Sequence, residues 1–235
     1  MKKLKYIFLL AGALSLASCE SWLDEDPQYT INTKTQFSTV ENARQALMGC
    51  YGYMSADNAY GQAWQEVTFG YCGFGWSQTN GSSTDLLVSM DGGIDETINT
   101  MAWRGMYKVI GETNAFIANI ADSPLESADK LPMEAAARFL RALAYYNLVS
   151  LWGDVPLKTV ASTSEGISMP RTPKEQVLGQ VVQDLNDALT IKETSDAGRI
   201  NSWAVKAFLG KVYYKMVKLG INTNENLKNA KDMFD

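Results

Sequence analysis

Apolar residues recur every three or four positions through most of the chain after residue 95, and this spacing constrains the fold more than any other feature. The clearest series runs over residues 96–121 and includes Trp103, Tyr107 and Ile110. Such spacing places one apolar stripe on the face of an α-helix. Similar patterns predict helices over residues 38–53, 132–152, 173–191 and 202–219, and a short one around Ala230. Strand patterns are sparse, so the sequence predicts an all-α fold.

The segment 132–152 is predicted to be a central, buried helix, because it is apolar on nearly every side. Glu134 and Arg138 stand four residues apart, which is the spacing of an ion pair on one helix face. Gly153 and Pro156 follow the segment and are expected to end the helix.

Two capping boxes predict where helices begin. Ser38 with Glu41 precedes the first helix, and Thr172 with Glu175 precedes a later one. In a capping box each side chain accepts a hydrogen bond from the other residue's free backbone N–H. Pro173 suits the first helical position, where a missing N–H costs nothing.

The last helices carry a repeat signature. Leu209-Gly210-x-x-Tyr213 followed by Ala230-x-x-x-Phe234 matches the packing core of a tetratricopeptide repeat. There, a glycine lets two helices approach, and the alanine and the aromatic ring fill the groove. The loop between the two halves is about eight residues longer than in the standard repeat. Successive helices of similar length are typical of helix pairs stacked in a solenoid, so we predict a tetratricopeptide-repeat-like helical bundle.

Residues 55–94 differ in character from the helical segments. Glycines interrupt both regular periods, so we expect a long irregular loop, and a loop of that length in a compact domain is usually functional. Aromatic and polar side chains in this segment are candidates for ligand binding, namely Trp64, Tyr71, Trp76, Asn80 and Asp85. The alternative is that these rings only pin the loop to the helices. Trp103, Trp152 and Trp203 lie at helical spacing and are expected in the core.

The first 37 residues are predicted to lie outside the helical domain. Three lysines begin the chain, an apolar run too short to span a bilayer follows, and small residues lead to Cys19. This pattern predicts a lipoprotein signal peptide over residues 1–18, with a diacylglycerol anchor on Cys19. Residues 19–37 then form an acidic tether and residues 38–235 the helical domain. A soluble secreted protein whose signal ends near a cysteine is the alternative.

Composition narrows the possible functions. The net charge is −5 and no basic run is present, so neither nucleic acid nor anionic lipid is an expected electrostatic partner. The chain has no histidine, the commonest metal ligand and general base near neutral pH, so we expect no enzyme activity, metal or cofactor. Paired carboxylates are the catalytic alternative that remains. Cys50 and Cys72 could pair in an exported protein, although free buried thiols are favoured.

Several stretches, in order, resemble the SusD/RagB family of surface lipoproteins that bind nutrients for a partner transporter. The most specific are Arg138-Phe139-Leu140-Arg141-Ala142 and Gly153-Asp154-Val155-Pro156-Leu157. The others are residues 19–27, 103–114, 143–149, 171–173, 184–188 and 198–200. Members of this family are considerably longer than this chain, which therefore resembles an amino-terminal half.

The resemblance implies a non-enzymatic protein on the outer membrane that captures an oligosaccharide and hands it to a SusC-like TonB-dependent transporter. It implies a shallow aromatic platform to which Trp64, Tyr71 and Trp76 could contribute, because the C–H face of a sugar stacks on such rings. Amide and carboxylate groups such as Asn80 and Asp85 would then satisfy the sugar hydroxyls. The acidic stretch behind Cys19 resembles an address to the cell surface. The alternative is a peptide-binding RagB-like member or a helical protein-interaction scaffold.

Arg138 and Arg141 stand three residues apart on one predicted helical turn, close enough to bind an anion together. The favoured alternative is a pair of structural ion bridges, to Glu134 and to Asp154.

Overall fold

The computed structural model describes residues 33–72, 89–90, 97–162, 168–191 and 198–235. Residues 33–235 form a compact unit of their own. Its α-helices are α2 (Thr33–Gln36), α3 (Val40–Ser55), α4 (Ala63–Tyr71), α6 (Thr97–Ala121), α7 (Ser127–Trp152), α8 (Lys174–Ala188), α9 (Ser202–Lys218) and α10 (Thr223–Phe234). Within the described ranges, β-type pairing is confined to one isolated bridge, between Val155 and Thr172. The predicted all-α fold is confirmed.

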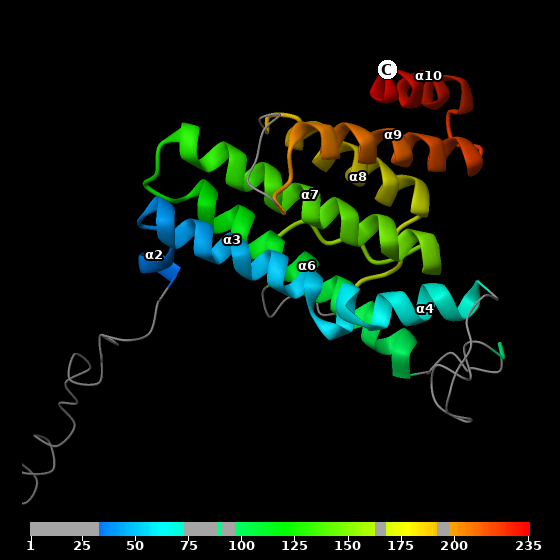
Figure 1. The fold of residues 1–235 in the computed structure, drawn as a ribbon, viewed down its shortest axis with the longest axis horizontal. Helices are drawn as coiled ribbons and strands as arrows, with labels where there is room; N and C mark the ends of the chain where they lie inside the picture. The colour runs from blue at the N-terminus through cyan, green and yellow to red at the C-terminus, as the bar shows by residue number, and fades with distance from the viewer. Residues whose placement is uncertain (1–32, 73–88, 91–96, 163–167, 192–197) are drawn as a thin grey trace, which may run out of the picture. The chain divides into compact units, whose positions relative to one another are not determined.

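Helices that follow one another in the chain pack side by side (Figure 1). The central helix α7 packs against both α6 and α8, and α9 packs against both α8 and α10. From the other end of the chain, α3 returns to lie against α6 and α7. This succession of packed helices is the arrangement expected of a tetratricopeptide-repeat-like bundle.

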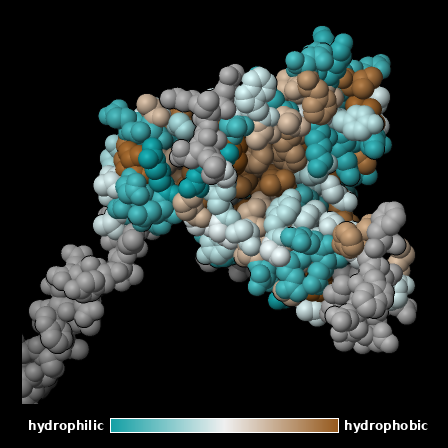
Figure 2. Space-filling model, viewed as in Figure 1, coloured by the Kyte–Doolittle hydropathy of each residue, from teal (hydrophilic) through white to brown (hydrophobic). Residues whose placement is uncertain are grey.

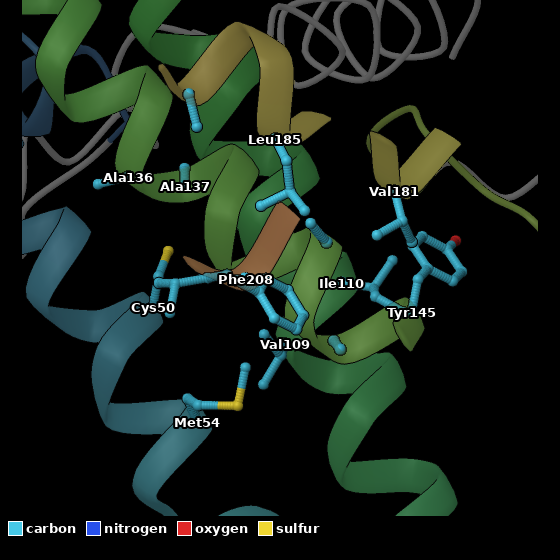
Figure 3. Packing of buried hydrophobic residues seen from close by; sticks show 14 of the residues in the cluster. Cys50, Met54, Val109, Ile110, Ala136, Ala137, Tyr145, Val181, Leu185 and Phe208 are labelled. Atoms are coloured by element: carbon cyan, nitrogen blue, oxygen red, sulfur yellow. The ribbon is translucent and has the colours of Figure 1, made fainter. Parts of the chain in front are cut away.

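The core lies where α3, α6, α7, α8 and α9 meet (Figure 3). Cys50 on α3, Val109 on α6, Leu185 on α8 and Phe208 on α9 all belong to this cluster. Tyr145, on α7, is among its largest fully buried side chains. The segment 132–152 was predicted to be buried because of its apolar character, and α7 is buried on most of its length, as expected.

The helix starts differ in detail from the two capping boxes. Thr39, and not Ser38, caps α3, because its hydroxyl accepts from the N–H of Asn42 at 3.2 Å. Ser38 instead donates to the carbonyl oxygen of Thr35 at 2.8 Å. The prediction failed because a threonine directly follows the serine and competes for the same role.

The second box is replaced by a cap from a distant residue. Pro173 stands at the N-cap position of α8 and makes no side-chain cap. Asp154 Oδ1 accepts from the N–H of Lys174 at 2.9 Å, so the segment after α7 caps α8. The expected end of α7 is confirmed, since Gly153 forms its C-cap.

Part of the segment predicted to be irregular is helical. A π-helical turn, Asp57–Gly61, leads into α4. This turn lies tightly on α6 at Gly105, where a Cβ atom would come within 1.8 Å of the Asn58 carbonyl oxygen. Only glycine fits there, because real Cβ atoms cannot approach a backbone so closely.

The repeat signature at the last two helices is confirmed as a packing device. The ring of Phe234 lies over Gly210, and a Cβ at Gly210 would come within 2.7 Å of the Phe234 Cζ. Only residues 219–222 separate α9 from α10, because α10 already begins at Thr223 and its first turns take up the extra length that was expected in the loop. Trp203, predicted to be in the core, is 59% exposed.

Cys50 and Cys72 are both free thiols. Cys50 is buried in the core, and burial raises the pKa of its thiol to about 12. Cys72 is exposed at the end of α4, so the expectation that both thiols are buried is wrong for it.

Cys19 and the acidic tether up to residue 32 lie outside the described residues. The last residues assigned to the tether are described: Thr33–Gln36 form α2, and Phe37 is buried in the core. Among the helices that are described, none combines the length and apolar character needed to cross a membrane.

Candidate functional site

The structure describes only part of the predicted ligand-binding set. Trp76, Asn80 and Asp85 lie outside the described residues, and of Tyr71 only the backbone, at the end of α4, is described. Trp64 is half-buried on α4, not on an irregular loop as expected, and its ring tilts against that of Tyr60 with centroids 5.9 Å apart.

Tyr60 links this ring pair to the core. Its hydroxyl accepts a hydrogen bond from Asn147 Nδ2 at 2.8 Å, and its carbonyl oxygen accepts from Gln65 Nε2 at 2.7 Å. Trp64 therefore packs on a tyrosine that is hydrogen-bonded to α7. Whether it contacts a sugar stays a prediction.

The arginine motif of α7 builds a buried clamp. Arg141 is 2% exposed and donates to both carboxylate oxygens of Asp184, from Nε at 2.8 Å and from Nη2 at 2.6 Å. Its partner is thus Asp184 on α8, not Asp154. Arg138 contacts Glu134 at 2.6 Å as predicted, and also Asp187 at 3.1 Å. Paired in this way, the two arginines are structural, as the favoured alternative held.

The clamp extends to the segment that follows α7. Arg141 Nη1 donates to Asn114 Oδ1 at 2.7 Å, and Asn114 Nδ2 donates to the carbonyl oxygens of Lys158 and Val160 at 3.0 and 3.1 Å. Tyr145 donates its hydroxyl proton to the Lys158 carbonyl at 2.8 Å and accepts from the Lys158 N–H at 2.7 Å. These bonds fix residues 158–160 against α6 and α7.

The fixed segment and α6 form the walls of a cleft of about 540 Å³. From α6 it is lined by Trp103, Tyr107, Ile110, Gly111 and Asn114. From the chain after α7 it is lined by Pro156, Lys158, Ser162, Ser168 and Met169. Sequence reasoning missed this cleft, because the spacing of Trp103 and Tyr107 indicates a core-facing stripe.

Three rings give the cleft a rigid aromatic end. The centroids of Trp103 and Tyr107 are 4.9 Å apart, and Trp152 meets Trp103 edge-on at 5.3 Å. The Tyr107 hydroxyl donates to the Pro156 carbonyl at 2.8 Å, and burial raises its pKa, so it stays protonated. Trp103 and Trp152 were expected in the core, but both are only partly buried.

A second cleft, of about 660 Å³, lies between α3, the start of α7 and the residues before α9. Its lining carries charges of both signs, including Glu41, Arg44, Asp129 and Arg199, beside the ring of Tyr51. The Arg199 guanidinium stands 5.5 Å from the centroid of that ring. Within the described part of the chain, no three acidic or cysteine side chains are grouped to hold a metal ion.

Comparison with known families finds one matching model, over residues 21–214. It is a SusD-like family described as "Starch-binding associating with outer membrane".

Curated proteins with similar sequences carry SusD-like names. One from Formosa agariphila is 27% identical over 223 residues, which are 88% of this chain and 42% of that protein. Another, from Bacteroides ovatus, is 29% identical over 220 residues, 90% of this chain and 39% of that protein. The chain thus spans about two fifths of the length of these relatives.

Solved structures agree with this likeness. A SusD superfamily protein from Bacteroides thetaiotaomicron superposes with a TM-score of 0.70 at 25% identity, over 83% of this chain and 45% of that one. A laminarin-binding SusD-like protein superposes with a TM-score of 0.67 at 26% identity, over 77% of this chain and 41% of that one.

Proposed function

Because the chain belongs to the SusD-like family, whose members associate with the outer membrane and bind starch-like glycans, we propose that it is a lipid-anchored oligosaccharide-binding protein of the cell surface. The observation that carries this proposal is the family match over residues 21–214, which spans nearly all of the described helices. In this proposal the protein captures a glycan without chemical turnover and delivers it to a SusC-like TonB-dependent transporter.

The ligand-binding surface includes the aromatic segment around α4. Trp64 has a fixed base on Tyr60, and Trp76 follows shortly after in the chain. Flat aromatic faces suit the apolar C–H face of a sugar ring, and neighbouring amides and carboxylates, such as Asn80 and Asp85, suit its hydroxyls. Tyr71, at the end of α4, lies between Trp64 and Trp76 in the sequence.

Glycan-array binding against a peptide panel tests the ligand class. We expect binding to one glycan class and none to peptides, with loss of affinity but not of fold in Trp76→Ala. Peptide binding without glycan binding would instead identify a RagB-like peptide receptor. Turnover of a bound glycan would contradict the assignment as a non-enzymatic protein.

Cys19 provides the membrane attachment in this proposal. An acyl chain adds about 0.8 kcal/mol of membrane affinity for each buried CH₂ group, so losing it should release the protein. We expect Cys19→Ala to appear in the soluble fraction and to lose labelling by a palmitate analogue. An unlabelled wild-type protein would contradict the anchor.

Surface exposure and the transporter partner have separate tests. Protease added to intact cells should digest the protein, whereas survival until the outer membrane is broken would place it in the periplasm. Co-purification with a TonB-dependent porin encoded beside it would support delivery. Its absence from the purified complex would contradict that step alone.

A further inference from the structure

The described residues that line the cleft on α6 include none from α4, and their side chains suggest a more specific ligand. We propose that this cleft binds one acidic sugar unit, a pyranose that carries a carboxylate or a sulfate group. This inference rests on the proposed glycan-binding function and adds to it a second site and a charge preference.

The size and walls of the cleft suit a small ring. Its volume of about 540 Å³ lies within the range of small-molecule sites. Trp103 is held by the edge of Trp152 at 5.3 Å and by the tilted ring of Tyr107 at 4.9 Å. An aromatic wall that is already fixed in place loses little conformational entropy when an apolar sugar face packs on it.

The charge of the cleft is positive, although the chain as a whole is acidic. Lys158 is the one charged residue among those that line the cleft in the described structure. Both backbone groups of Lys158 bond the Tyr145 hydroxyl, so its position is fixed. None of the described residues that line the cleft is acidic.

A second cation, Arg171, acts on Tyr107 without being among the residues that line the cleft. The Arg171 guanidinium donates to the Asp154 carbonyl at 3.3 Å, and its charge acts on the Tyr107 hydroxyl, lowering a pKa that burial raises overall.

The neutral polar groups of the cleft are of two kinds: those bonded to the protein itself, and those that can contact a ligand. Asn114 belongs to the wall, because Arg141 and the backbone of residues 158–160 use its amide. The hydroxyls of Ser162 and Ser168 line the cleft from exposed positions. Each can donate to or accept from a sugar hydroxyl.

Gly111 offers a way to fill the cleft without disturbing the helix. It lines the cleft on α6, and a Cβ atom added there meets no atom within 4 Å. Gly111→Leu should therefore occupy the cleft while the fold persists. Gly111→Ala is the matched control, since it adds one methyl group and favours the helix.

The test is calorimetric titration of the full chain with three probes: galacturonic acid trisaccharide, its neutral galactose counterpart and a galactose-sulfate counterpart. We expect wild-type protein to bind at least one acidic probe about tenfold more tightly than the neutral one, as one charge-assisted contact predicts. Lys158→Gln should remove that preference and leave the neutral probe unchanged. Lys228→Gln, on the exposed face of α10, should change neither.

The outcomes separate this inference from the proposed function. Loss of acidic-probe binding in Gly111→Leu, with retention in Gly111→Ala and unchanged circular dichroism, supports the site. Acidic-probe binding that neither Gly111→Leu nor Lys158→Gln changes, or equal wild-type affinity for the acidic and neutral probes, overturns the acidic site and leaves the proposed function standing. Failure of wild-type protein to bind any glycan overturns both.

Discussion

Two regions of the molecule share the same helical periodicity but bury their side chains very differently. Between α6, α7 and α8, Tyr145 is fully buried, and Arg141 and Asp184 form an ion pair away from water. On α9 and α10, Trp203 and Phe234 are 59% and 60% exposed, and Figure 2 shows apolar residues at the surface of this end of the bundle.

The difference follows from what surrounds each helix. The helix α7 has α3, α6 and α8 around it, whereas the outer faces of α9 and α10 pack on no other described helix. There, lysine side chains lie over the exposed rings, with Lys206 at 4.8 Å from the Trp203 centroid and Lys218 at 5.1 Å from that of Tyr214. Periodicity therefore specifies which residues share a face, and neighbouring helices decide whether that face is buried.

The largest effect should come from breaking the buried ion pair. Asp184→Asn leaves the Arg141 charge uncompensated inside the protein, which should lower the free energy of unfolding by about 3–5 kcal/mol. Asp187→Asn, one turn along α8 and 36% exposed, is the matched control and should cost at most about 1 kcal/mol. Urea unfolding measures both, and equal losses would contradict the buried role of the clamp.

A smaller loss is expected from Tyr145→Phe. The change removes two hydrogen bonds and takes the partner from the Lys158 N–H, while the Lys158 carbonyl keeps its bond from Asn114. This loss should cost about 1–3 kcal/mol. Urea unfolding near neutral pH measures this loss. A Tyr145→Phe variant that is as stable as the wild-type protein at neutral pH would contradict the clamp on the segment after α7.

The same tyrosine should make stability fall at alkaline pH. Burial raises the pKa of Tyr145 from 10.0 to about 12, so its hydroxyl stays protonated in the folded protein when the unfolded chain has begun to ionise. Its contribution is complete below pH 10 and is lost as the pH rises toward 12. Tyr145→Phe should therefore lose less stability across this window than wild-type protein does.

Packing at the exposed end gives the next effect in size. Gly210→Ala would push the Phe234 ring off α9, whereas Gly179→Ala on α8 adds a methyl group in open space. We expect Gly179→Ala to stabilise by about 0.5–1 kcal/mol and Gly210→Ala to lie about 1–2 kcal/mol below it. Hydrogen exchange should show faster exchange in α10 for Gly210→Ala alone. Equal stability and exchange in both variants would contradict the contact.

The smallest effect should come from Trp203→Ala. Its ring is mostly exposed, so the loss should stay below about 1 kcal/mol, including the contact with Lys206. Phe208→Ala, on the buried face of the same helix, should cost about 3–5 kcal/mol, because its ring packs against Phe139 and Tyr146. Thermal unfolding of the two variants measures the contrast, and a large loss in Trp203→Ala would show that its face is covered in solution.

The long helices could be predicted from the sequence, because their periodic stripes outweigh local signals. The series over residues 96–121 corresponds to α6, and that over 202–219 to α9, within one residue at each end. The helix α4 was missed because Gly61 and Gly70 lie at its two ends and indicate a loop. Trp203 was misplaced because the spacing of apolar residues does not reveal which faces have neighbours.

The cleft on α6 lay beyond sequence reasoning for a different reason. The cleft exists because Asn114 donates a hydrogen bond to the carbonyl of Lys158, which is 44 residues away in the chain. No local sequence pattern indicates such a contact. The arginine pair was recognised as structural, but Asp184 was not identified as the partner, since it lies on another helix. Cys19, Trp76, Asn80 and Asp85 remain predictions from sequence.

The bridge between Val155 and Thr172 bears on where the sequence of this protein can take up insertions. Two backbone hydrogen bonds, of 3.2 and 3.0 Å, join the ends of the segment between α7 and α8, and Asp154 fastens the same junction to α8. Doubling the length of a flexible loop costs only about 0.6 kcal/mol in closure entropy. Insertions between residues 161 and 169 should therefore leave the helices in register. New residues inserted in this segment during evolution should change the surroundings of the cleft on α6, while the helical bundle folds as before.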